Sequence, residues 1–134
     1  MGFCSIFLLA ETGIALQEEL NNHKCNHTWK SDGTTNGTVQ LKDINPGGHN
    51  IYLFRHFVNA NGTLLFSFYD DENGYELWKS TGTTAGTTIV RDINPGIYGS
   101  QVTNITYFGK NISFFEAYDG KKRQTANASP LGTP

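Results

Sequence analysis

Two tryptophans, Trp29 and Trp78, are the side chains best suited to ligand chemistry in this chain. An indole ring offers a flat apolar surface on which a sugar can stack. The same ring contributes a large apolar area when it packs between neighbouring sheets. Because each tryptophan stands at the same place in a duplicated segment, packing is the interpretation that we favour for both.

Carboxylates with calcium-like spacing occur in three places. Asp43 and Asp92 each begin the sequence Asp-Ile-Asn-Pro-Gly, whose D-x-N spacing resembles a set of calcium ligands. An EF-hand requires a bidentate Glu about twelve positions along, where this chain has Phe54. A turn capped by the aspartate carboxylate is therefore the better interpretation. Asp70-Asp71-Glu72 is interpreted as a solvated hairpin tip, since its counterpart at Asp119 lacks the extra carboxylates.

One segment combines histidine and cysteine at close spacing. His23, Cys25 and His27 would share a face of an extended chain, but a structural zinc site takes four ligands and the only further cysteine is the distant Cys4. Ser-His-Asp arrangements, phosphate-binding loops before a helix and dinucleotide fingerprints are absent from the sequence. We predict no catalytic, cofactor-binding or metal-binding residues, and a protein that is not an enzyme.

These residues are positioned by a sequence that occurs twice. Residues 29–47 read WKSDGTTNGTVQLKDINPG and residues 78–96 read WKSTGTTAGTTIVRDINPG, with an ungapped offset of 49 and 13 of 19 positions identical. A period in this range indicates repeat architecture. The register continues to Tyr118-Asp119, 49 residues after Tyr69-Asp70, and no tryptophan-containing strand follows.

The central copy divides into four short strands. Alternating apolar and β-branched residues predict strands over 51–59, 63–69, 75–79 and 87–93, with further strands over 102–108 and 112–118. Asn61-Gly62 is typical of a two-residue type I′ hairpin turn. Pro95-Gly96 ends the fourth strand, because proline cannot donate to a strand ladder. We therefore expect an all-β fold of four-stranded antiparallel blades, as in a β-propeller.

The segment YELWKSTGTTAGTTIVRDINPG at 75–96 resembles the ELWxxDGT repeat family. Residues 29–47 keep most of the same pattern, with His27-Thr28 where the family has Glu-Leu, and the second copy has Thr81 where Asp is usual. The hairpin over 61–67 is similar to the family's NGTLFFSA segment. The resemblance covers about residues 25–119. It implies tandem propeller-blade-like repeats of secreted or surface proteins, mostly bacterial, and no shared catalytic residue.

The resemblance implies a non-catalytic extracellular module that binds or scaffolds through its blade loops. Its partner would be a protein or a glycan, and its location outside the cell or on the cell surface. The chain covers about two copies of the repeat, too few to close a propeller alone. Self-association through open β edges is therefore expected. The alternatives are a fragment of a propeller hydrolase or lyase, and a truncated reading frame without independent function.

Composition narrows the partners further. The chain has 134 residues, a net charge of −2 and a pI near 6.0, which disfavours nucleic acid and anionic membranes as partners. No apolar run is long enough to span a membrane. Asn-x-Ser/Thr sequons, which suit either glycosylation or ordinary turns, occur at Asn26, Asn36, Asn61, Asn104, Asn111 and Asn127.

The two ends of the chain lack the repeat pattern. Residues 1–24 contain the apolar run FCSIFLLA and fit either a signal peptide or a short helix. Residues 25–119 form the repeat region, with a partial copy, a full copy and a second partial copy. Residues 120–134 are polar and end in Pro-Leu-Gly-Thr-Pro, which predicts a disordered tail.

Overall fold

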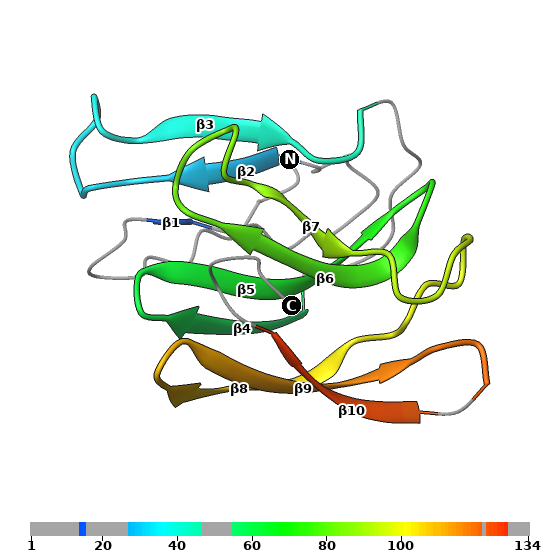
Figure 1. Ribbon diagram of the computed structural model, residues 1–134. Coiled ribbons are helices and arrows are strands. Elements are labelled where there is room, and N and C mark those ends of the chain that lie inside the picture. Colours follow the sequence, from blue (N-terminus) through cyan, green and yellow to red (C-terminus); the bar gives the residue numbers. More distant parts are fainter. Residues whose placement is uncertain (1–13, 16–26, 47–54, 122, 129–134) are drawn as a thin grey trace.

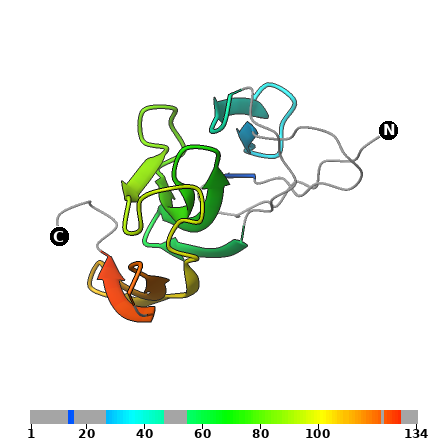
Figure 2. The same cartoon turned by 90° about the vertical axis from the view of Figure 1, so that its right-hand side faces the viewer.

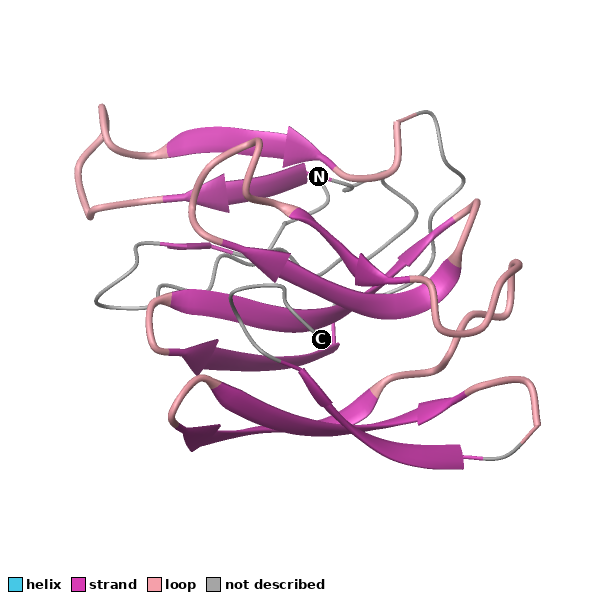
Figure 3. Ribbon diagram, in the orientation of Figure 1, coloured by secondary structure: helices cyan, strands magenta, loops and turns pink. Residues whose placement is uncertain are grey.

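The computed structural model describes residues 14–15, 27–46, 55–121 and 123–128, and within these ranges the protein is all-β with no helix (Figure 3). Every strand pair within its sheets is antiparallel. The strands are β1 (Ile14–Ala15), β2 (His27–Lys30), β3 (Val39–Asp43), β4 (Arg55–Ala60), β5 (Thr63–Asp70), β6 (Gly74–Ser80), β7 (Thr88–Arg91), β8 (Thr103–Gly109), β9 (Ile112–Tyr118) and β10 (Arg123–Ala128).

These strands form three sheets stacked as layers. The first sheet has the order β1-β2-β3, the middle sheet β4-β5-β6-β7 and the third sheet β10-β9-β8. Figures 1 and 2 show the middle sheet between the other two, with β3 and β10 in the outer layers. All three sheets are open, and no ring is closed by the described strands. The all-β antiparallel prediction is confirmed.

The 49-residue offset of the sequence is also the offset of the strands. β5 begins at Thr63 and β9 at Ile112, while β6 begins at Gly74 and β10 at Arg123. β3 and β7 are related in the same way. The strands of neighbouring sheets therefore keep the spacing of the duplicated sequence, so a residue in one sheet has a counterpart 49 positions along in the next.

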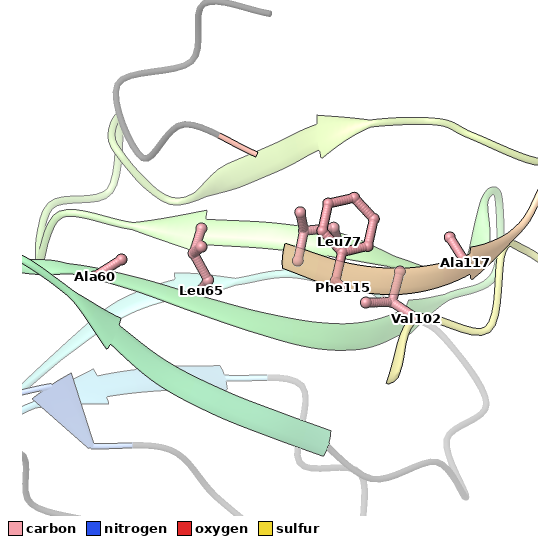
Figure 4. Packing of buried hydrophobic residues seen from close by; sticks show 6 residues of the cluster. All are labelled: Ala60, Leu65, Leu77, Val102, Phe115 and Ala117. Carbon is pink, nitrogen blue, oxygen red and sulfur yellow. The ribbon is translucent and has the colours of Figure 1, made fainter. Parts of the chain in front are cut away.

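Two apolar clusters hold the three layers together. Between the first and middle sheets, Ile44 packs on Leu64, Phe66, Phe68 and Trp78. The other cluster joins the middle and third sheets and consists of Ala60, Leu65, Leu77, Val102, Phe115 and Ala117 (Figure 4). Neighbouring positions of β5 thus serve opposite clusters, as the alternation of a strand requires. Trp78 is 6% exposed, so its predicted packing role is confirmed.

The predicted hairpin turn is confirmed and has a counterpart. Asn61 and Gly62 have φ angles of +53° and +86°, the two positive values that a type I′ turn requires. Lys110 and Asn111, one repeat later, have φ angles of +51° and +60°. The same turn geometry is therefore kept even where the sequence offers no glycine.

The third sheet corrects the prediction for the C-terminal residues. Disorder was expected over 120–134, yet Arg123–Ala128 pair with β9 as β10. A strand edge presents backbone N–H and C=O groups that bind an extended segment whatever its side chains. The register does change: Phe66 pairs with Trp78, whereas Phe115 pairs with Ala126 and not with Asn127. In the N-terminal 24 residues only β1 is described, so the signal-peptide and helix alternatives lie otherwise outside the described residues.

Candidate functional site

The loop after β2, residues 31–38, is ordered by its own hydroxyl groups. Ser31 Oγ lies 2.7 Å from Thr38 Oγ1 and accepts a hydrogen bond from Gly33 N at 3.0 Å. Thr38 Oγ1 also donates to Thr34 O at 2.7 Å, and Gly37 N donates to Thr34 Oγ1 at 2.9 Å. Side chains here replace the backbone partners that a turn lacks. We call this segment loop 1.

Loop 2, residues 80–87, repeats the arrangement. Ser80 Oγ lies 2.7 Å from Thr87 Oγ1 and accepts from Gly82 N at 3.2 Å, while Thr87 Oγ1 donates to Thr83 O at 2.7 Å. Gly86 N donates to Thr83 Oγ1 at 2.9 Å. The Ser, Gly and Thr positions shared by the two sequences are therefore the ones that build the loop.

The positions that differ between the loops are exposed. Asp32 and Asn36 in loop 1 are replaced by Thr81 and Ala85 in loop 2, and all four side chains face solvent. Asp32 Oδ1 accepts hydrogen bonds from Thr34 Oγ1 at 2.7 Å and Thr34 N at 2.9 Å. The side-chain hydrogen bond, followed by the backbone one, lowers the pKa of Asp32 below its ordinary value of 3.8. The loop pair thus presents an ionised carboxylate beside hydroxyl and amide groups.

Contacts between copies hold loop 2 against the strands that carry loop 1. Thr84 Oγ1 donates to Leu41 O at 2.6 Å, and Lys42 Nζ donates to Thr87 O at 2.9 Å. Lys30 Nζ donates to Gly82 O at 3.3 Å. Each of these bonds joins a loop 2 residue to β2 or β3, the strands that carry loop 1.

A cleft of about 480 Å³ lies between the first two copies. It is lined by Ile44, Asn45 and Pro46 of the first copy and by residues 70–73 and Trp78 of the second. Asp71 N donates to Asn45 Oδ1 at 3.4 Å across this boundary. Because Trp78 is buried in the core, its ring face is not available for sugar stacking.

Asp43 and Asp70 both cap turns as predicted, but Asp70 is 5% exposed and is therefore not the solvated tip residue that was expected. Asp70 Oδ1 accepts from Glu72 N at 2.9 Å and Asn73 N at 2.6 Å, and Asn73 Nδ2 donates to both carboxylate oxygens. Asp43 Oδ1 accepts from Asn45 N at 3.2 Å. These carboxylates are engaged by their own turns, as in Asx turns generally.

Sequence reasoning missed Glu76, the most deeply buried carboxylate among the described residues. It has no exposed surface and accepts hydrogen bonds from Ser100 N at 2.9 Å, Ser100 Oγ at 2.5 Å and Asn94 N at 3.1 Å. Burial raises the pKa of Glu76 above its ordinary value of 4.5, an effect that these hydrogen bonds oppose. The signal was present as a lone acidic residue in the apolar segment Tyr75-Glu76-Leu77-Trp78.

The remaining candidates stay apart from these features. Trp29 is half-buried on β2. His27 belongs to β2, while Cys4, His23 and Cys25 lie outside the described residues. In the part of the chain that the structure describes, no group of three His, Cys, Asp or Glu side chains could hold a metal ion.

Comparisons with known proteins add no assignment: no family model, curated protein or solved structure matched the chain. Among the described residues, no helix is long and apolar enough to cross a membrane. The site must therefore be interpreted from its own geometry.

Proposed function

We propose that the chain is a non-catalytic, extracellular binding module of the ELWxxDGT repeat type, whose sheets act as propeller blades and whose paired loops contact a protein or glycan ligand. The observation that carries this proposal is the shared hydroxyl framework of loops 1 and 2, on which only exposed side chains differ. A fixed framework with variable outward side chains is how binding loops are built on rigid scaffolds.

The polar character of the loops supports a hydrogen-bonded ligand. Asp32, Asn36, Thr83 and Thr84 are exposed and offer both donors and acceptors. Asp70 and Glu76, by contrast, are buried and already accept hydrogen bonds from backbone N–H groups. A general acid or base must reach its substrate, so these two carboxylates support a structural role and a binding function rather than catalysis.

The test is a binding screen with wild-type protein on a glycan array and against extracellular proteins. The variant Asp32→Thr/Asn36→Ala gives loop 1 the side chains that loop 2 carries, so its hydroxyl framework is preserved. Lys110→Ala, in the exposed turn between β8 and β9, is the control. We expect binding that is lost in the loop variant and kept in the control. Binding that is the same in all three proteins would contradict the proposal.

A further inference from the structure

The outer face of the third sheet is exposed and carries aromatic and aliphatic side chains beside polar ones, among them Glu116, which accepts a hydrogen bond from Asn104 Nδ2 at 3.0 Å. Ile112, Phe114 and Tyr118 on β9 are 40%, 41% and 39% exposed, and they alternate with buried residues that face the middle sheet. Phe108 on β8 meets Phe114 edge to face, with ring centroids 5.8 Å apart. An exposed aromatic patch of this kind marks an interaction surface. We call Phe108, Ile112, Phe114 and Tyr118 the outer patch.

The middle sheet shows what covers the equivalent face. One repeat earlier, Thr63 and Leu65 of β5 correspond to Ile112 and Phe114 of β9. Thr63 is 7% exposed and Leu65 is fully buried, because the third sheet packs on that side of the middle sheet. The face that the third sheet buries on the middle sheet is therefore exposed at the equivalent positions of the third sheet.

The first sheet carries the matching face. In the middle sheet, Trp78 and its partner Ile89 pack toward the first sheet. Their counterparts in the first sheet are Trp29 and Gln40, which pair with each other in the same way. Trp29 is half-buried and Gln40 is exposed. Within the described residues, the third sheet thus exposes a receiving face, and the first sheet carries an inserting face that is half-buried at Trp29 and exposed at Gln40.

We propose that the outer patch binds the first sheet of a second copy of this chain, head to tail, in the way that the third sheet binds the middle one. Such a contact is heterologous, and it closes if the second chain returns to the first. Two chains supply six sheets, within the roughly four to eight that a closed propeller contains. The inference rests on the equivalence of the faces and not on ligand binding by the loops, so either proposal can fail alone.

The experiment is sedimentation equilibrium of the full chain over a range of concentrations, with two single variants. Phe114→Asp places a charge on the receiving face, and Gln40→Asp places one on the inserting face. Tyr98→Asp, at an aromatic residue that is 79% exposed in the loop between β7 and β8, is the control. Circular dichroism establishes that each variant is folded, and Phe114→Ser replaces Phe114→Asp if that variant is not.

We expect wild type and Tyr98→Asp to sediment at twice the 14.8 kDa chain mass. Each face variant alone should dissociate with a dissociation constant raised at least about 100-fold, because a charge is buried without a partner. An equimolar mixture of the two variants should recover dimers, since each supplies the face that the other lacks. A monomeric wild type, a dimer that survives Phe114→Asp, or a mixture that stays monomeric would each overturn the proposal.

Discussion

Gly99 is a position where a single methyl group should be strongly destabilising. It has a φ angle of +58°, and its backbone forms a parallel bridge with Tyr75 of β6. A Cβ atom at Gly99 would lie 2.5 Å from Tyr75 O and 2.8 Å from Gly74 C, with Tyr75 N closer still. All three atoms belong to the backbone of the middle sheet, so no side chain can rotate away to relieve the contact.

The cost of Gly99→Ala follows from two effects. Alanine in the left-handed conformation costs about 1 kcal/mol relative to glycine. To relieve the overlap, the backbone segments at Gly99 and Tyr75 must also move apart. This movement weakens the hydrogen bonds from Ser100 N and Gln101 N to Tyr75 O, which are 2.8 and 3.1 Å long, at a cost of about 1 kcal/mol each. We expect the free energy of unfolding to fall by about 3 kcal/mol.

Gly62 provides the matched control. Its φ angle is +86°, but a Cβ atom there would have no heavy atom within 4 Å. Gly62→Ala should therefore cost only the conformational strain, about 1 kcal/mol. Urea unfolding of wild type, Gly99→Ala and Gly62→Ala measures the difference in the free energy of unfolding, provided that the dependence of this free energy on urea concentration is the same for all three proteins. If Gly99→Ala were no more destabilising than Gly62→Ala, the close approach of the two backbones would be refuted.

Three further predictions concern buried side chains. Because the pKa of Glu76 is raised in the folded state, its contribution to stability is largest below about pH 4.5 and declines as pH rises. The stability advantage of wild type over Glu76→Gln, measured as a difference in the free energy of unfolding, should therefore shrink from pH 4 to pH 7. An advantage that grows over this range would contradict the prediction. Ser80→Ala removes a buried hydroxyl that is hydrogen-bonded to Thr87 and Gly82, so it should lower the free energy of urea unfolding by about 1–2 kcal/mol. Ser67→Ala removes a buried hydroxyl with no hydrogen-bond partner and should be neutral or stabilising. Equal costs for the two variants would argue against the hydrogen-bonded framework of loop 2. Ile44→Ala should cost about 2–4 kcal/mol by thermal or urea unfolding, since Ile44 packs on the middle sheet, and a cost below about 1 kcal/mol would exclude that packing.

The contacts of the duplicated Asp-Ile-Asn-Pro-Gly segment show its role in the packing of the sheets. Ile44 of the first copy packs on the middle sheet, and Asn45 accepts a hydrogen bond from Asp71 of the next copy. In the second copy, Ile93 packs against the cluster shared with the third sheet, and Asn94 Nδ2 donates to Gly99 O at 2.7 Å. The isoleucine of each segment therefore packs against a cluster shared with the following sheet, whereas the Asn94 bond is local to the crossover after β7.

Local features of the fold were predictable because local chemistry determines them. Asn61-Gly62 supplies positive φ angles at little cost. The apolar run Leu64-Leu65-Phe66 fits a strand that is buried on both faces, as β5 is. β10 was missed because its strand is specified by the edge of β9 and not by its own polar side chains. Glu76 was missed because its partners Asn94 and Ser100 lie far along the chain, on a crossover that periodicity does not reveal.

The site itself was predicted only in part. The capped turns at Asp43 and Asp70 follow from side chains that reach backbone groups two or three residues ahead. The packing of loop 2 on β3 depends instead on bonds such as Thr84 to Leu41, between residues 43 apart. No sequence pattern within one copy reports such a bond, so this packing emerges only from the stacking of the copies.

The most direct test of the account is the affinity of a ligand identified in the binding screen for wild type and for Asp32→Thr/Asn36→Ala, measured alongside their melting temperatures. If the exposed residues of loop 1 contact the ligand, the variant should bind at least about tenfold more weakly, the loss of one to two hydrogen bonds, with an unchanged melting temperature. Equal affinities of the two proteins would contradict the claim that these loops form the binding surface.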